Sequence, residues 1–556
     1  MAEINDVVYQ SSLDINKKPH QVILSKTHLT WEAAVSRTCD GSPSSEPFIA
    51  NKACRQIPLE ELIAVCPEKS LNHSNTPTSA RRKLGSPKHD TPLYIEMEPM
   101  HPVAFSIYVL NKTPNHKWRK KKVTFFCGEE KLCDTWVVKI KETLSDKRFN
   151  RPRSLLVFVN PFGGRRKAPS IYDCQIAPLF ELAEIQTHVI KTTHANHAKE
   201  ILAHYNLRTV DGVVCVGGDG MFTELLNGLL DRRQREAGIL QTPQHSPLPP
   251  NLRIGIIPAG STDAIVYTTT GINDPKTSAL HIILGDSIGI DVCSIYSGQE
   301  FLRYSCSMLS YGYYGDMLKD SESNRWMGPS RYQLAGAKKF LGNRAYEGEV
   351  SFRLSSNTET NPKDKVFCVS GCNVCSFSKE KTDQQDSHST DSITEISHDA
   401  DGWHRFRGKF LAVASFTMSC RCKLAPIGPS PFCHLGDGTS DIMVVQHCSR
   451  IQFLRHLYRC SGTKANQFDF PFIKVFRVKE WSFKATEQKE EMSQSSPGKQ
   501  NKSRECRTSV WNCDGEVLEQ PNLNVRVHCQ LVNLFARGIE DFDQERNFSS
   551  CCSLCE

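Results

Sequence analysis

The sequence predicts a multidomain protein of α/β and β structure: a small β-barrel closed by a helix, then an α/β lobe, then a β-rich lobe built as a sandwich. Its 556 residues exceed what one hydrophobic core fills, since single cores stop growing near about 250 to 300 residues. Residues 20–146 alternate like short strands and end in an amphipathic helix, residues 150–285 repeat strand–helix units, and residues 286–540 are strand-rich. We expect residues 1–19 to be disordered and residues 541–556 to form a cysteine-containing tail.

The composition excludes several classes of protein. A net charge of +7 spread over the whole chain is too diffuse for a nucleic-acid partner. The N-terminus lacks the basic start and apolar core of a secretory signal, and no window reaches the ~18 apolar residues of a spanning helix. We therefore expect a cytoplasmic protein whose 23 cysteines are thiols, metal ligands or lipidation sites rather than disulfides.

The first domain ends in a helix with one apolar face. Leu132, Trp136, Ile140 and Leu144 recur at the spacing of that face, after a series of short alternating strands. This order, with a tryptophan in the closing helix, resembles a pleckstrin-homology domain. A basic run at 117–122 lies between two of its strands and predicts contact with an anionic membrane surface, the alternative being a solvated hairpin tip.

A glycine turn with one aspartate follows the second buried strand of the α/β lobe. Gly217, Gly218 and Gly220 allow backbone conformations and close approaches that favour a phosphate group, and the following apolar-faced helix points its N-terminus at the turn. Asp219 in the same turn would repel phosphate, so it needs another function, such as holding Mg²⁺ or accepting a proton from an attacking hydroxyl. The alternative is an aspartate that caps the helix.

Two further turns end neighbouring strands in the same way. The first strand ends in Asn160-Pro161-Phe162-Gly163-Gly164, and the third ends in Gly260-Ser261-Thr262-Asp263. Open α/β sheets bind ligands at the carboxyl ends of their parallel strands. The sequence therefore predicts a ligand site at this edge.

NPFGG, GGDG and PAGSTD, in this order, resemble the catalytic domain of the diacylglycerol kinase family of lipid kinases, which also covers the sphingosine kinases. Further segments extend the resemblance over about residues 20 to 540 and towards the ceramide kinases within that family: THANHAKE, GYYGDMLKDSESNRW, CVSGCNVC, HLGDGTSD and WNCDGEV. The resemblance implies ATP- and Mg²⁺-dependent transfer of a phosphoryl group to the primary hydroxyl of ceramide. A sphingosine or diacylglycerol kinase and a non-catalytic lipid-binding homologue remain alternatives.

The resemblance also implies roles for single residues. Asp219 matches the general base, and Gly217, Gly218 and Gly220 flank the acceptor hydroxyl. The residues that match ATP contacts are Asn160, Pro161, Phe162, Thr192, Thr193, His194, Ala195, Asn196, Glu224, Gly260, Ser261, Thr262, Arg325, Arg331, Asp514, Gly515 and Glu516. Met221 departs from the threonine that many members carry after GGDG.

The β-rich lobe contains a group of cysteines and two polar insertions, near 377–402 and 484–507, which we expect to be disordered. Cys368, Cys372 and Cys375 have spacings that suit structural zinc, with Cys420 and Cys422 as candidate partners, but three ligands in one segment leave the fourth open. The alternative is a set of reduced thiols. In the ceramide kinase resemblance this motif is associated with activity, without an implied metal.

The segment 449–460 alternates basic and apolar residues at helical spacing. A basic amphipathic helix of this kind serves calmodulin or a membrane surface, or packs on a core with its arginines in solvent. The family resemblance makes calmodulin a candidate partner, and it implies peripheral association with the Golgi or plasma membrane.

Overall fold

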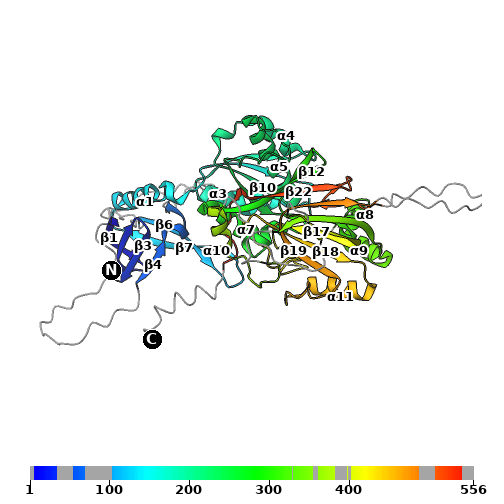
Figure 1. Cartoon of the computed structure of the whole chain (residues 1–556). Coiled ribbons are helices and arrows are strands. Elements are labelled where there is room, and N and C mark those ends of the chain that lie inside the picture. The colour runs from blue at the N-terminus through cyan, green and yellow to red at the C-terminus, as the bar shows by residue number, and fades with distance from the viewer. Residues whose placement is uncertain are drawn as a thin grey trace, which may run out of the picture. The chain divides into compact units, whose positions relative to one another are not determined.

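The computed structural model describes residues 6–33, 54–68, 103–328, 330–354, 361–381, 397–398, 402–486 and 508–540. It divides into two compact units, one formed by 1–111 with 119–151 and the other by 112–118 with 152–556 (Figure 1). Each unit has its own sheet and hydrophobic core. None of the described helices combines the length and apolar character needed to cross a bilayer.

The first unit is a seven-stranded sheet with one long helix. Its elements are β1 (Val7–Ile15), β2 (Lys18–Ser25), β3 (His28–Ala33), β4 (Arg55–Pro58), β5 (Leu62–Pro67), β6 (Val103–Lys112), β7 (Trp118–Cys127) and α1 (Glu130–Leu144). The strand order is β4-β3-β2-β1-β7-β6-β5. In the described part of the chain these strands form an open series, so closure into a barrel stays a prediction.

The core of this unit is centred on the tryptophan of α1. Trp136 is fully buried, its ring centroid lies 4.9 Å from that of Tyr9, and its indole N–H donates to Ser11 Oγ at 2.8 Å. Ile140, one turn further along the same face, is buried as well. The predicted helix, with its apolar face, is therefore confirmed.

The expectation of a disordered N-terminus over 1–19 is wrong from Val7 onward. β1 begins at Val7 and pairs antiparallel with β2 along its length, with Leu13 opposite His20. Leu13 and Ile15 alternate into the core while their neighbours face out. This short period-2 pattern buries enough apolar surface, once β2 is beside it, to order the strand.

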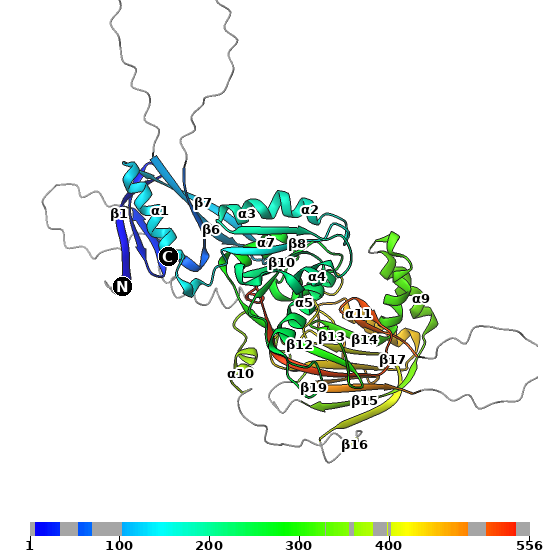
Figure 2. The ribbon, with the colours of Figure 1, turned by 90° about the horizontal axis from the view of Figure 1, so that it is seen from above.

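The second unit begins with a parallel sheet covered by helices on both faces. Its strands are β8 (Ser154–Val159), β9 (Gln186–Lys191), β10 (Gly212–Gly217) and β11 (Arg253–Pro258), in the order β11-β10-β8-β9. Its helices are α2 (Ala168–Ile171), a π-helical turn (Tyr172–Ile176), α3 (Ala177–Leu182), α4 (His197–His204), α5 (Asp219–Ala237), α6 (Ala264–Thr270) and α7 (Pro275–Leu284). Figure 2 shows α4 and α5 on one face of the sheet and α2 and α3 on the other. The buried strands β8, β10 and β11 confirm the three that the sequence predicts.

The β-rich lobe continues the same sheet, because β22 pairs with β11 at Leu534 and Ile254. Its elements are β12 (Ile288–Ser297), β13 (Glu300–Ser305), β14 (Met308–Gly312), α8 (Tyr313–Glu322), α9 (Ser330–Gly342), β15 (Tyr346–Leu354), α10 (Asn373–Lys381), β16 (Ser397–His398), β17 (His404–Phe416), β18 (Ser440–Gln446), α11 (Arg450–Cys460), β19 (Ile473–Ala485), β20 (Trp511–Cys513), β21 (Glu516–Leu518) and β22 (Leu523–Leu534). The long strands β17 and β19 each pair with β15 over one half and with β18 over the other. A second core, which includes the fully buried Trp481 and Trp511, lies within this lobe.

The two polar insertions begin later than the sequence predicts. Helix α10 continues to Lys381 and residues 397–398 form β16, so the expected disorder from 377 to 402 is wrong at these positions. Strand β19 continues to Ala485 and pairs with β15. The rest of both insertions, and the tail 541–556, lie outside the described residues.

Candidate active site

Three loops leave the parallel sheet at one edge. The N–H of Asn160, directly after β8, donates to the carbonyl of Val216 in β10 at 3.1 Å. The N–H of Ala259, directly after β11, donates to the carbonyl of Gly217 at 2.9 Å. The turns that the sequence predicts as a ligand site therefore start side by side.

The first loop is held by the side chain of Asn160. Its Oδ1 accepts the N–H groups of Phe162 at 2.9 Å and Gly163 at 3.1 Å, which leaves the Phe162 ring exposed. Gly164 has φ +56°, and a Cβ there would lie 2.4 Å from the carbonyl oxygen of Ala259. Glycine at this position lets the first loop pack directly on the third.

Two glycines are needed where the second loop meets the third. A Cβ on Gly218 would lie 2.9 Å from Gly260 Cα, and one on Gly260 would lie 2.5 Å from Gly218 Cα. A Cβ on Gly220 would meet nothing within 4 Å. The close approach of the two backbones, in addition to any ligand, therefore explains the glycine at position 218 of one turn and at position 260 of the other.

Asp219 lies at the start of α5 and is half-buried between these loops. Its Oδ2 accepts the N–H of Ala264 at 3.0 Å and its Oδ1 accepts the N–H of Ile265 at 3.1 Å, both from the first turn of α6. Burial raises the pKa of Asp219, the two N–H donors oppose this rise, and the negative charge of Asp514 adds to it. The carboxylate thus caps a neighbouring helix, rather than its own, and has a fixed orientation.

Asp263 is a second carboxylate of the site, and the sequence analysis gave it no role. It is buried, its Oδ1 accepts the N–H of Gly260 at 2.9 Å, and its Oδ2 accepts from Asn273 Nδ2 at 2.8 Å. Burial and the charge of Asp219 raise the pKa of Asp263 to about 6. Asp263 is the last residue of PAGSTD, and its position in this motif is the sequence feature that could have marked it as a site residue.

The loop after β9 carries a second group of residues, 192–196, that are expected to bind the nucleotide. The N–H of Thr192 donates to the carbonyl of Val159 at 2.9 Å, so this loop also begins at the common edge. Thr192 is buried, whereas four residues are exposed: Thr193, His194, Ala195 and Asn196. Glu224 reaches α4 from α5, and its Oε1 accepts the N–H of Ala198 at 2.7 Å. This carboxylate therefore fixes the helix that follows the loop.

Both carboxylate oxygens of Asp514 accept hydrogen bonds from the segment 305–308. It is buried and accepts from five donors, namely Ser305 Oγ, Ser307 Oγ and the N–H groups of Cys306, Ser307 and Met308. Asp514 and Gly515 both have positive φ, which makes a tight turn between β20 and β21. Glu516 pairs with Arg303. The charge of Asp514 acts on Asp219, so the turn at residues 514–516 lies near the predicted general base.

The two predicted triphosphate arginines are not joined to this edge by any interaction in the described residues. Arg331 donates to Tyr332 Oη at 2.7 Å and lies 3.5 Å from Glu322 Oε1. The side chain of Arg325, in the turn Arg325–Met327, lies outside the described residues. Their roles stay predictions.

The predicted thiol cluster gains a ligand that the sequence analysis missed. Cys368, Cys372 and Cys375 lie with His434, and their candidate ligand atoms are within 4.8 Å of one another. The suggested partners lie elsewhere: Cys420 Sγ donates to the carbonyl of Ser307, and Cys422 forms a backbone bridge with Ala425. His434 begins the segment HLGDGTSD, which in the sequence stands out only through its resemblance to the ceramide kinases.

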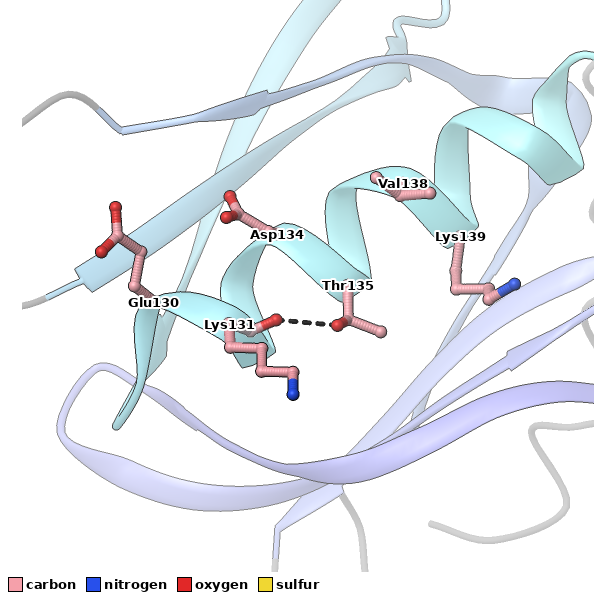
Figure 3. Close-up of a pocket in the computed structure, with 6 residues that line it drawn as sticks. All are labelled: Glu130, Lys131, Asp134, Thr135, Val138 and Lys139. Atoms are coloured by element: carbon pink, nitrogen blue, oxygen red, sulfur yellow. Dashed lines mark hydrogen bonds between the residues drawn. The ribbon is translucent and has the colours of Figure 1, made fainter.

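A hollow in the first unit has no such chemistry. It follows one face of α1 and is lined by Glu130, Lys131, Asp134, Thr135, Val138 and Lys139 (Figure 3). All six side chains come from a single helix, and the hydrogen bond drawn among them is Thr135 Oγ1 to its own helix backbone. We do not assign it to the active site.

The half-buried Asp219 thus lies among glycine-containing loops at the carboxyl edge of a parallel sheet, where open α/β sheets bind ligands. Three family models match the chain: "Ceramide kinase PH domain" at residues 9–140, "Diacylglycerol kinase catalytic domain" at 154–295 and "Ceramide kinase C-terminal domain" at 306–552.

Curated relatives cover most of the chain. "Ceramide kinase" of Homo sapiens is 46% identical over 501 residues, which is 88% of this chain and 90% of that protein. "Ceramide kinase" of Mus musculus is 43% identical over 514 residues, or 90% of this chain and 93% of that protein. A putative diacylglycerol kinase from Bacillus anthracis str. Sterne superimposes with a TM-score of 0.43 at 16% identity, over 69% of this chain and 97% of that one. The chain belongs to the ceramide kinase family.

Proposed function

We propose that the protein transfers the γ-phosphoryl group of ATP to the primary hydroxyl of ceramide, giving ceramide 1-phosphate, with Asp219 as the general base. The observation that carries the proposal is the position of Asp219, a half-buried carboxylate fixed where three glycine-containing loops meet. The 46% identity to a protein named ceramide kinase supports ceramide as the acceptor.

Asp219 acts through its orientation and its pKa. The N–H groups of Ala264 and Ile265 each use one lone pair of the carboxylate, so further lone pairs remain for the acceptor hydroxyl. As the hydroxyl oxygen attacks the γ-phosphorus, its proton passes to the carboxylate, the bond from the γ-phosphorus to the bridging oxygen breaks, and ADP leaves. The raised pKa brings this base closer to working pH, which improves proton transfer.

The loops at the common edge bind the triphosphate. Exposed hydroxyls of Thr193, Ser261 and Thr262, with backbone N–H groups of the glycine turns, donate to phosphate oxygens. Arg325 and Arg331 offset charge on the transferring group, as the family resemblance implies. These contacts hold the γ-phosphoryl group in line with the acceptor.

The carboxylates of the site suit Mg²⁺. Asp219 and Asp263 offer carboxylate oxygens, and the charge of Asp219 acts on Asp263. Mg²⁺ binds one or two carboxylates together with substrate phosphates. Asp219 and Asp263 would hold Mg²⁺, which would supply positive charge against the phosphates. Asp263, buried and raised in pKa, is the residue whose ionisation such a cation favours.

The pleckstrin-homology unit brings the enzyme to its lipid substrate. We propose that the basic strand β7 contacts anionic headgroups, and that the protein associates peripherally with cytoplasmic faces of the Golgi or plasma membrane. A calmodulin site over 449–460 has less support, because α11 buries Phe453 and His456 in the core.

A kinase assay with labelled ATP and a panel of ceramide, sphingosine and diacylglycerol in detergent micelles, with and without Mg²⁺, tests the proposal. We expect ceramide to have the highest kcat/KM. Asp219→Asn should lower kcat by about 10² to 10⁴-fold, because that is the usual contribution of a general base. Asp134→Asn, which changes an exposed carboxylate of α1, is the matched control and should keep full activity. Full activity of Asp219→Asn, or preference for another lipid, would contradict the proposal.

A further inference from the structure

The cysteine-histidine cluster has the dimensions of a tetrahedral metal site. Cys368 Sγ lies 3.7 Å from Cys375 Sγ, and Cys372 Sγ lies 3.3 Å from His434 Nδ1. A tetrahedral Zn²⁺ with Zn–S near 2.3 Å and Zn–N near 2.0 Å would set these separations at about 3.8 Å and about 3.5 Å. A disulfide would need sulfur atoms near 2.05 Å apart. The cysteines are free thiols at the spacing that suits a shared cation.

The local backbone places the three thiols on one side. The N–H of Cys372 donates to the carbonyl of Val369, and Gly371 at φ +68° completes this turn directly before α10. Cys372 and Cys375 then lie three residues apart at the start of a helix, where side chains share a face. His434 comes from the loop between β17 and β18, about 60 residues further along the chain.

The surroundings of His434 fit a ligand. Its imidazole is fully buried, and Nε2 has no hydrogen-bond partner among the described residues. Asp437 Oδ2, in the same buried loop, also lacks a partner there, and the two side chains interact electrostatically. Metal-binding histidines commonly donate their second ring N–H to a carboxylate. With Nδ1 facing the thiols, Asp437 is suited to this supporting role.

A further side chain joins the two segments that carry the ligands. Gln530 Nε2 donates to the carbonyl of Cys375 at 2.8 Å and to that of Gly436 at 2.9 Å. The cluster is therefore held by the fold before any ion binds, which lowers the cost of assembling it.

We propose that Cys368, Cys372, Cys375 and His434 bind one Zn²⁺ as a closed structural site. Three thiolates and one imidazole are soft to borderline donors that favour zinc over Mg²⁺ or Ca²⁺, which prefer oxygen. Four protein ligands fill the tetrahedron, so the ion has no open position for substrate. The site goes beyond the proposed kinase activity and does not depend on it.

The zinc joins α10 to a loop that reaches the active site. In that loop the N–H of Arg421 donates to Thr268 Oγ1 of α6, the helix whose first N–H groups hold Asp219. The ion acts at a distance on the position of the base, and its residues are positioning residues. Loss of zinc should lower thermal stability and kcat together, with KM for ATP less affected.

Metal analysis of the full-length protein, purified with reductant and without added chelator, tests the site. We expect about one zinc per chain in the wild type, and thiolate-to-metal absorption together with tetrahedral cobalt bands after exchange into Co²⁺. Cys372→Ser and His434→Ala should lose the metal. His434→Cys should keep it, because four thiolates also bind zinc tetrahedrally. Cys420→Ser and Cys422→Ser are matched controls that should retain one zinc.

Wild-type protein that is folded and carries no stoichiometric zinc, before and after incubation with Zn²⁺, would overturn the proposal. The same holds if the control variants lose zinc as the cluster variants do, or if the cluster thiols react freely with a thiol reagent in the absence of chelator. If the cluster variants fail to fold, the wild-type zinc content and cobalt spectrum decide. A kinase that is inactive on ceramide but carries zinc would contradict only the proposed function.

Discussion

At the scale of single residues, the contact between Gly218 and Gly260 determines how closely two loops of the site can approach. A Cβ on Gly260 would lie 2.5 Å from Gly218 Cα, which is backbone, and equally close to Asp263 Oδ1, whose carboxylate is held by hydrogen bonds from Gly260 N–H and Asn273 Nδ2. Gly260→Ala should therefore force the loops apart and cost about 1 to 3 kcal/mol of folding free energy. Thermal unfolding should shift down by several degrees, with lost kinase activity.

Gly220→Ala is the matched change in the neighbouring loop. A Cβ at Gly220 meets nothing within 4 Å, and the residue lies in the first turn of α5. Its melting temperature should not fall below that of the wild type, since alanine has a higher helix propensity than glycine. Equal destabilisation of both variants would contradict the packing argument.

The buried carboxyl of Asp263 should make stability depend on pH. Its pKa is about 6 in the fold, against 3.8 for an ordinary aspartate, because burial and Asp219 disfavour its charge. The folded protein therefore holds this proton where the unfolded chain has lost it. The contribution of Asp263 to the free energy of unfolding is full below about pH 4 and is lost as the pH rises through about 6.

Between pH 5 and 7.5 this one group should lose about 1 kcal/mol. Unfolding of the wild type and of Asp263→Asn, followed at both pH values, measures it. The variant should be destabilised more at pH 5 than at pH 7.5 relative to the wild type. A difference that does not change with pH would mean that Asp263 is ionised throughout.

At the scale of elements, α4 depends on a carboxylate from another helix. Asn196 precedes α4 in a left-handed conformation and makes no side-chain cap, whereas Glu224 accepts the N–H of Ala198 at 2.7 Å. Glu224→Ala should cost about 1 kcal/mol, as for loss of a cap, and should raise KM for ATP by loosening the loop at 192–196. Glu224→Gln keeps an acceptor oxygen and should change both quantities less.

Kinetics and melting of these two variants separate capping from direct contact. If Glu224→Gln raises KM for ATP as much as Glu224→Ala while the melting temperature is unchanged, the charge itself contacts the nucleotide and the capping account is wrong.

The elements also show where sequence patterns carry information. Strands β8, β10 and β11 are buried on both faces, so they appear as continuous apolar runs and were predicted. Strand β9, at the edge of the same sheet, has mostly exposed or half-buried residues and gave no such run. His434 was missed for another reason. Tertiary structure brings it next to the three cysteines, and no sequence motif links residues that lie about 60 positions apart.

At the scale of the whole molecule, each unit has its own hydrophobic core. Trp136 anchors the first, while Trp481 and Trp511 lie in the β-rich core of the second. The order of domains could be predicted because the periodicity changes along the chain. The sequence does not predict that one sheet continues from the parallel strands of the α/β lobe into the β-rich lobe, because the pairing of β22 with β11 joins residues 280 positions apart.

The basic strand of the first unit should bind anionic membranes through particular lysines. Lys120 and Lys121 are exposed on β7, with Lys120 Nζ 5.1 Å from the Tyr108 ring, whereas Lys122 Nζ is 2.7 Å from Glu68 Oε1. The charge of Lys122 is already partly neutralised, so it should add less to the attraction. Each of the other two should contribute about fivefold to the affinity for anionic vesicles.

Co-sedimentation of the full-length protein with phosphatidylserine-containing vesicles measures this binding. The pair Lys120→Ala and Lys121→Ala together should weaken it by about 20- to 30-fold at low salt, and Lys122→Ala by a few-fold at most. Raising the ionic strength should reduce the difference in vesicle binding between the wild type and these variants, because exposed charges are screened over about 8 to 10 Å. Lys131→Ala, which removes an exposed lysine of α1, is the control for the loss of one charge in the single variant Lys121→Ala. If it weakens binding as much as Lys121→Ala, net charge and not the β7 surface attracts the membrane.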